Sequence, residues 1–240
     1  MAIVTTNTCY MDDETLLEAV IAFDDEQQGQ RPAVMVSHAW GGRDEFVAQK
    51  AKKLAEKGYV GFALDMYGQG VRGSSREENA ALMMPLMKDR GKLQKRIHAA
   101  YSAVRQLPWV DQQYIAAIGF CFGGLCVLDL ARTGLDLKGV VSFHGLLQPP
   151  ENTQANAIKA KVLVLHGYED PMAPVESVQA LQQELSAAGA DWQLHTFGQT
   201  MHAFTNPLAN DAAFGTVFQP DADRRSWQCM ENFLAEIFTH

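Results

Sequence analysis

The sequence predicts an α/β fold in which a mostly parallel central sheet is flanked by helices on both faces. Short runs rich in Val, Ile, Leu and Ala alternate with longer segments of helical periodicity almost throughout the chain. Several of the short runs are near-continuously apolar, which is typical of strands covered on both sides. A chain of 240 residues with this alternation commonly forms one unit, so we expect a single domain over residues 1–240.

The expected elements alternate along the chain, with polar or glycine residues at most of their ends. The expected strands are residues 17–23, 32–37, 60–64, 115–118, 139–143, 162–165 and 192–197. The expected helices are residues 45–57, 77–87, 92–106, 124–133, 175–188 and 223–238. We expect the sheet to open with an antiparallel pair whose turn is formed by residues 24–29.

The charge and hydropathy of the chain favour a small-molecule partner. Its 28 acidic and 20 basic side chains give a formal net charge of -8, which disfavours the basic surface that nucleic acids and anionic membranes require. No apolar run reaches the ~18 residues of a membrane-spanning helix, and the first residues lack the pattern of a secretory signal. We therefore expect a cytoplasmic protein without nucleic-acid or membrane partners, either a monomer or a homodimer.

The four cysteines of the chain are too few for the disulfide framework of a small secreted domain. They are Cys9, Cys121, Cys126 and Cys229, and none belongs to a Cys-x-x-Cys pair. Reduced thiols are therefore expected, and the surroundings of each cysteine decide its interpretation.

Cys121 lies in a glycine-rich segment between a predicted strand and a predicted helix. Residues 119–124 read Gly-Phe-Cys-Phe-Gly-Gly, which is a nucleophile elbow with cysteine in the position of serine. Such a turn exposes the central side chain at a helix N-terminus, where the helix dipole stabilises a thiolate. The segment predicts a reactive Cys121, and a buried, inert cysteine is the alternative interpretation.

Asp170 and His202 each follow one of the last two predicted strands. Because the carboxyl ends of parallel strands meet at one edge of a sheet, both side chains should lie near Cys121. The α/β-hydrolases place nucleophile, acid and histidine in this order along the chain. We predict that Cys121 is the nucleophile, His202 the base and Asp170 the residue that orients the base. The alternatives are an ordinary turn aspartate, with Glu169 as a rival acid, and a packed histidine.

A tetrahedral intermediate needs fixed donors for its oxyanion. The backbone N–H groups of Phe122, next to the nucleophile, and of Ala39, after an earlier strand, are in the expected sequence positions. The side chains that are candidates for the substrate pocket are His38, Trp40, Tyr67, Arg72 and Phe204. Packing in the core or at its rim explains most of them equally well, and a solvated loop charge explains Arg72.

With these segments the sequence resembles the dienelactone hydrolase family. The resemblance rests on residues 119–124, on His166 and Gly167 followed by Asp170, and on residues 202–204, and it spans most of the chain. It implies an α/β-hydrolase fold, a Cys–Asp–His triad, hydrolysis of an enol-lactone or related ester of the carboxymethylenebutenolidase type, and neither metal nor organic cofactor. One departure is His38, where members of this type carry a glutamate associated with control of the resting thiol. The substrate therefore stays open.

The cysteine chemistry and the resemblance together predict a hydrolase of small ester or lactone bonds that works through a thioester intermediate. A thiolate is itself a good leaving group, so its attack on an amide tends to reverse, whereas an enolate leaves readily from an ester. Two alternatives remain open: a thioesterase or acyltransferase, and a thiol redox sensor that keeps the same scaffold without turnover.

Overall fold

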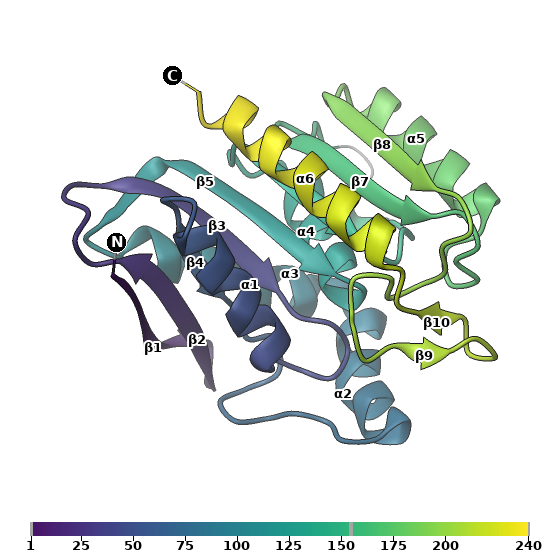
Figure 1. The fold of residues 1–240 in the computed structure, drawn as a ribbon, viewed down its shortest axis with the longest axis horizontal. Helices are drawn as coiled ribbons and strands as arrows, with labels where there is room; N and C mark the ends of the chain where they lie inside the picture. The colour runs from purple at the N-terminus through teal and green to yellow at the C-terminus, as the bar shows by residue number, and fades with distance from the viewer. Residues whose placement is uncertain (1, 154–155, 240) are drawn as a thin grey trace. The chain divides into compact units, whose positions relative to one another are not determined.

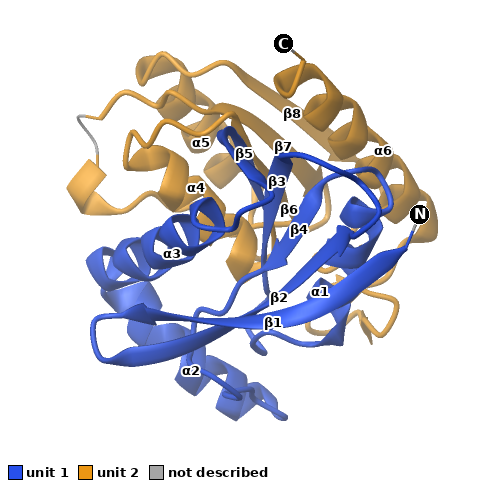
Figure 2. Cartoon of the chain, turned by 90° about the vertical axis from the view of Figure 1, so that its left-hand side faces the viewer, with its two compact units in different colours: residues 1–118 blue, residues 119–240 orange. Residues whose placement is uncertain are grey.

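The computed structural model describes residues 2–153 and 156–239 of the chain. The chain forms two compact units, residues 1–118 and residues 119–240 (Figure 2). The boundary falls inside strand β5 (Val110–Phe120), so Gly119 and Phe120 belong to the second unit. The expectation of one domain over residues 1–240 stays a prediction.

The strands of the first unit are ordered β1-β2-β4-β3-β5. β1 pairs with β2 and β2 with β4 in antiparallel fashion, whereas β3 and β4 are parallel. Their bounds are β1 (Ile3–Asp12), β2 (Thr15–Asp24), β3 (Arg31–Ser37) and β4 (Val60–Ala63). Every residue of β4 and all but one of β3 are buried, which agrees with strands covered on both faces.

The antiparallel opening of the sheet differs from the prediction. The predicted turn at residues 24–29 is wrong, because the hairpin turn lies at Asp13 and Glu14, between β1 and β2. β2 then pairs with β4 rather than with β3. The first strand has mostly exposed or half-buried side chains, so it carries no apolar run that would predict it. Its threonines are the remaining signal, since β-branched residues favour strands even when they are exposed.

The first unit has three helices among its described residues, and a side chain caps each of them. They are α1 (Glu45–Ala55), α2 (Arg76–Lys88) and α3 (Arg90–Arg105), capped in turn by Asp44, Ser75 and Asp89. Each cap accepts a backbone N–H of the first helical turn, which has no acceptor inside the helix. Within this unit α1 lies on one face of the strands and α3 on the other (Figure 1). The predicted helices of this unit are therefore confirmed.

The second unit contains parallel strands in the order β6-β7-β8. Their bounds are β6 (Gly139–Phe143), β7 (Lys161–Gly167) and β8 (Trp192–Phe197). Every residue of β6 and all but the first of β7 are buried, as their apolar runs predict. A small antiparallel pair, β9 (Asn210–Asp211) and β10 (Thr216–Val217), lies outside this sheet and was not predicted.

The helices of the second unit cover both faces of its strands. They are α4 (Phe122–Arg132), α5 (Val175–Ala187) and α6 (Pro220–Ile237), with a short helical turn η1 (Glu151–Thr153). α6 lies on one face of the strands of this unit, and α4 and α5 lie on the other (Figure 1). No helix within residues 2–153 and 156–239 combines the length and apolar character needed to cross a membrane.

Candidate active site

Cys121 stands at a sharp turn between the end of β5 and the start of α4. Its backbone φ is 56°, in the left-handed region that residues other than glycine rarely adopt. Gly119 makes the turn possible, because a Cβ there would lie 2.0 Å from the carbonyl oxygen of Gly123. A Cβ on Gly124 would lie 2.6 Å from the Ser142 hydroxyl. These glycines let the strand and the helix approach closely, and they leave Cys121 half-buried at the N-terminus of α4.

The backbone N–H of Cys121 is shared between two acceptors at the end of β6. It donates to the carbonyl oxygen of Phe143 at 3.0 Å and to Nδ1 of His144 at 3.2 Å. The other ring nitrogen of His144, Nε2, lies 2.8 Å from Oγ1 of Thr205. Because Nδ1 accepts a hydrogen bond, the proton of the ring belongs on Nε2, which then donates to Thr205.

Asp170 and His202 meet beyond the carboxyl ends of β7 and β8. Nδ1 of His202 lies 2.7 Å from Oδ2 of Asp170, and both residues are almost fully buried. The second carboxylate oxygen of Asp170 accepts the N–H of Met172 at 2.8 Å. The carboxylate therefore fixes the His202 tautomer with a proton on Nδ1. Glu169, the rival acid, is exposed.

Two glycines allow the loops of Asp170 and His202 to approach each other. A Cβ on Gly167 would lie 2.5 Å from the carbonyl oxygen of Thr200, and one on Gly215 would lie 2.2 Å from the Pro171 ring. Gly215 also accepts the backbone N–H of His202 at 2.9 Å. The segment that contains β9 and β10 therefore supports the histidine. Sequence reasoning did not single out Gly215 for this role.

The pKa of His202 reflects the burial of the ring and two neighbours, Cys121 and Asp170. Burial lowers this pKa, but the charge of Cys121, the hydrogen bond to Asp170 and hydrogen bonding to Cys121 outweigh burial and raise the pKa to about 10. Because Nδ1 is bonded to Asp170, the interaction with Cys121 falls to the other ring nitrogen, Nε2, which is itself buried. Both observations suit a base that is protonated beside a sulfur atom.

The loop after β3 is held by a second buried histidine. Nδ1 of His38 lies 2.6 Å from the carbonyl oxygen of Ala39, and Nε2 accepts the N–H of Met66 at 3.1 Å. Burial lowers the pKa of His38, so the ring is neutral and carries its proton on Nδ1. The Tyr67 hydroxyl donates to the carbonyl oxygen of Trp40 at 2.9 Å. These bonds tie the loop after β3 to the segment after β4.

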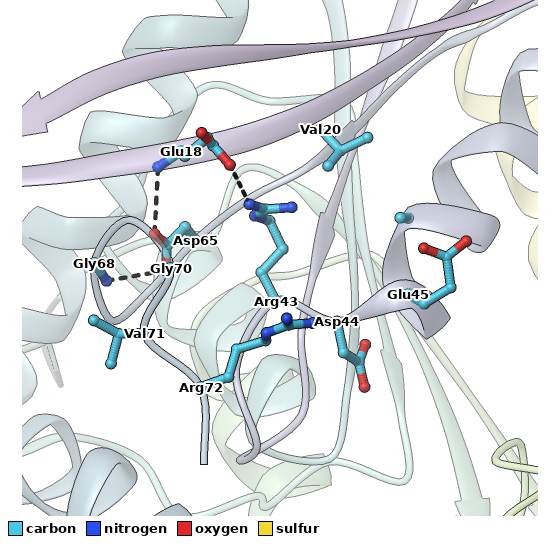
Figure 3. A pocket seen from close by; sticks show the side chains of 11 residues that line it. Glu18, Val20, Arg43, Asp44, Glu45, Asp65, Gly68, Gly70, Val71 and Arg72 are labelled. Carbon is cyan, nitrogen blue, oxygen red and sulfur yellow. Dashed lines mark hydrogen bonds and ion pairs between the residues drawn. The ribbon is translucent and has the colours of Figure 1, made fainter. Parts of the chain in front are cut away.

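The other two predicted pocket residues lie in different surroundings. Phe204 is fully buried, with its ring 5.0 Å from that of His144 and 5.6 Å from that of Phe197, so it packs in the core of the second unit. Arg72 is exposed and lines a cavity of about 270 Å³ in the first unit (Figure 3). Arg43 lines the same cavity and is paired with Glu18 at 2.5 Å.

Comparisons with known proteins agree with this geometry. The family model described as dienelactone hydrolase family matches residues 17–238. This chain belongs to the dienelactone hydrolase family. A putative carboxymethylenebutenolidase of Yersinia pestis is 27% identical over 231 residues, which cover 92% of this chain and 84% of that protein. An uncharacterized protein of Caenorhabditis elegans is 38% identical over 151 residues, which cover 62% of this chain and 96% of that protein.

A solved structure gives the family assignment its structural counterpart. A dienelactone hydrolase-like promiscuous phosphotriesterase from metagenomic libraries has a TM-score of 0.95 and 34% identity, with 100% of both chains covered. The predicted fold class, an α/β-hydrolase fold, is therefore confirmed. Membership of the family also confirms the predicted class of enzyme, a hydrolase of the ester and lactone type.

The structure brings together the predicted residues of the second unit and adds two that the sequence did not assign to the site. Asp170 and His202 are in contact, and Cys121 raises the pKa of the His202 ring. The additional residues are His144, which accepts the backbone N–H of Cys121, and Thr205, which contacts the other side of the His144 ring. His144 directly follows a buried strand, as His38 does, and from this position alone a scaffold role is the ordinary interpretation.

Proposed function

We propose that this chain hydrolyses small ester or lactone bonds with Cys121 as nucleophile, His202 as base and proton donor, and Asp170 as the residue that orients His202. The observation that supports this most strongly is the 2.7 Å contact between Asp170 and His202, together with the effect of Cys121 in raising the pKa of His202 to about 10. A ring with this pKa is an imidazolium at neutral pH. Such an imidazolium stabilises a thiolate at Cys121.

In the first half of the reaction the Cys121 thiolate attacks the carbonyl carbon and forms a C–S bond. The carbonyl π electrons move onto oxygen and give a tetrahedral oxyanion. When the intermediate collapses, the C–O bond to the leaving group breaks, and the imidazolium of His202 gives its Nε2 proton to the departing oxygen. The alcohol or enol leaves, and Cys121 holds the acyl group as a thioester.

In the second half water replaces the alcohol. His202 is now neutral and accepts a proton from water, while the water oxygen attacks the thioester carbonyl. Collapse of this second intermediate breaks the C–S bond, releases the carboxylic acid and regenerates the thiolate beside the imidazolium. Asp170 keeps Nδ1 protonated throughout, so that Nε2 is the nitrogen that exchanges protons.

The oxyanion donors in this proposal are the backbone N–H groups of Phe122 and Ala39. Phe122 is the first residue of α4, and N–H groups of the first turn have no acceptor inside their helix. Ala39 follows β3, and its own carbonyl oxygen is held by His38. Backbone donors of this kind need no reorganisation when the charge develops.

The replacement of the family's glutamate by His38 changes what controls the resting thiol. A neutral His38, with both ring nitrogens bonded to backbone groups, supplies no negative charge. The resting protonation state of Cys121 then depends mainly on His202. We therefore propose that the thiolate–imidazolium pair exists before substrate binds, and that esters and lactones other than dienelactone are substrates.

The test is turnover and acyl-enzyme formation by wild type, Cys121→Ala and Cys121→Ser on a panel of lactones, aryl esters and thioesters. Wild type should show a burst of aryl alcohol equal to the enzyme concentration and a mass increase on the peptide that contains Cys121. Cys121→Ala should lack both. Full turnover by Cys121→Ala would refute the proposal. Rapid alkylation of Cys121 without any turnover would favour a thiol sensor, and transfer to added thiols or alcohols would favour an acyltransferase.

A second candidate activity is phosphotriester hydrolysis at the same cysteine. It is favoured by the 34% identity and TM-score of 0.95 to the promiscuous phosphotriesterase. The thiolate would attack phosphorus, an aryl oxide would leave, and water would later cleave the P–S bond. An aryl phosphotriester tested with wild type and Cys121→Ala decides this: release of aryl oxide with phosphorylation of Cys121 supports it, and equal rates for both proteins contradict it.

A further inference from the structure

We propose that His144 is a positioning residue, which holds the nucleophile elbow in its attacking orientation through a relay from Thr205 to the backbone N–H of Cys121. This inference rests on the proposed function of Cys121. It concerns contacts within the second unit only.

The relay joins three segments that are distant in the sequence. His144 follows β6, Cys121 precedes α4, and Thr205 lies three positions after His202. Nδ1 of His144 accepts the Cys121 N–H at 3.2 Å, and Nε2 lies 2.8 Å from the Thr205 hydroxyl oxygen. One imidazole ring therefore connects the loop of the nucleophile to the loop of the base.

The relay works with only one tautomer of His144. A proton on Nδ1 would point at the N–H of Cys121, so two donors would face each other in a buried site. The N–H of Cys121 therefore selects the tautomer with its proton on Nε2, and Thr205 stabilises that tautomer because its hydroxyl oxygen accepts the Nε2 proton. Both residues are almost fully buried, at 2% and 1% exposure, so water does not compete for these bonds.

The backbone at the elbow needs such support. Cys121 has a φ of 56° and His144 has a φ of 39°, and non-glycine residues in this region are strained. Strain of this kind persists where the surroundings hold the chain in more than one way. The shared N–H of Cys121, bonded to Phe143 and to His144, is one such restraint.

The His144 ring also forms a wall for the base. Its centroid lies 5.2 Å from that of His202, with the two planes at 66°, and 5.0 Å from that of Phe204. A neutral ring at this place lets His202 carry a positive charge without a like-charged neighbour. The His144 side chain therefore positions both the backbone of Cys121, which carries the attacking sulfur, and the ring of His202.

The decisive variant is Thr205→Val, which removes the acceptor for Nε2 and keeps the volume of the side chain. We expect acylation of Cys121, measured as the burst rate with an aryl ester, to slow about tenfold, while KM stays within about twofold. Thr205→Ser restores the acceptor and should restore the burst rate. Thr133→Val, which removes a hydroxyl hydrogen bond to Leu130 at the far end of α4, is the matched control and should acylate at the wild-type rate.

Two further measurements separate this inference from the proposed function. Proton–nitrogen correlation spectra report the tautomer of His144 directly, and we expect Nδ1 to be unprotonated in wild type and partly protonated in Thr205→Val. Alkylation of Cys121 by iodoacetamide, followed by mass spectrometry of its peptide, reports the elbow without any substrate and should slow in Thr205→Val. A protonated Nδ1 in wild type, or an unchanged alkylation rate in a folded Thr205→Val, overturns the role of His144. If Thr205→Val slows the alkylation of Cys121 but wild type shows no ester turnover, only the proposed hydrolase activity is overturned.

Discussion

The loops after β3 and β6 each begin with a buried histidine, but the two rings are used in opposite ways. His38 carries its proton on Nδ1 and accepts a backbone N–H at Nε2. His144 accepts a backbone N–H at Nδ1 and directs Nε2 at a hydroxyl. The same residue type at the same place after a strand therefore adopts either tautomer, and the nitrogen that meets a backbone donor decides which one.

The partners of the two rings explain why their consequences differ. His38 contacts the backbone of Ala39 and Met66, so it fixes the conformation of a loop in the first unit. His144 contacts the backbone of Cys121 and lies 5.2 Å from His202, so it fixes the groups that react. A neutral imidazole thus has a structural role where it bonds to the backbone of a loop, and a positioning role where it bonds to the backbone of a reacting residue.

His202 is the third case, because a carboxylate rather than a backbone group fixes its tautomer. Asp170→Asn should therefore have the largest effect on activity. The amide can donate to Nδ1 and favour the wrong tautomer, and we expect kcat for aryl esters to fall by about 10³–10⁴-fold. Glu169→Gln changes the exposed neighbouring carboxylate and is the matched control, with activity unchanged. A loss of less than tenfold in Asp170→Asn would show that the carboxylate does not select the tautomer.

Gly215→Ala tests how closely the loops that carry Asp170 and His202 must approach. Gly215 has a φ of 81° and a Cβ there would meet the Pro171 ring at 2.2 Å, so we expect a loss of about 2–4 kcal/mol in the free energy of unfolding, together with a lower kcat. Gly189→Ala is the control, because its φ is 70° but a Cβ there meets nothing within 4 Å. Urea unfolding of both variants separates the cost of a positive φ, which both variants share, from the cost of the clash with Pro171, which only Gly215→Ala has. Equal losses in the two variants would contradict the role of the close contact.

His38→Phe should destabilise the protein by about 1–3 kcal/mol, because the carbonyl of Ala39 and the N–H of Met66 lose their buried partner. His38→Gln offers Met66 an acceptor at a similar distance along the side chain and should recover part of this loss. Urea unfolding measures both changes. Proton–nitrogen spectra of wild type should show Nδ1 of His38 protonated, opposite to His144. The same tautomer in both rings would remove the contrast between the two loops.

The sequence predicted most of the elements and the central residues of the candidate site, because these carry strong local signals. The buried strands β6 and β7 are mostly apolar, and the elbow has glycines where the strand and the helix approach too closely for a side chain. Asp170 and His202 were found from their position after strands, which parallel topology turns into spatial proximity.

The features that the sequence did not reveal depend on contacts between distant segments. The side chains of β1 are mostly exposed or half-buried, and no periodic apolar pattern marks it. The contact of Gly215 with Pro171 follows from the path of a long loop, which local propensity does not determine. The roles of His38 and His144 depend on which nitrogen meets which donor, and that information exists only in three dimensions.

The charge of His202 sharpens the contrast with the neutral histidines. Its pKa is raised from about 6.5 in the unfolded chain to about 10 in the folded one, so the folded ring keeps, between these values, a proton that the unfolded ring has lost. The stabilisation is complete below about pH 6.5 and is lost as the pH rises through about 10. The urea concentration at the midpoint of unfolding should fall more steeply with rising pH for wild type than for His202→Gln. Cys121→Ser removes the thiolate charge that raises the pKa of His202, so this stabilisation should be lost at a lower pH than in wild type. An equal slope in wild type and His202→Gln would mean that the His202 ring is neutral in the folded protein, as His38 and His144 are.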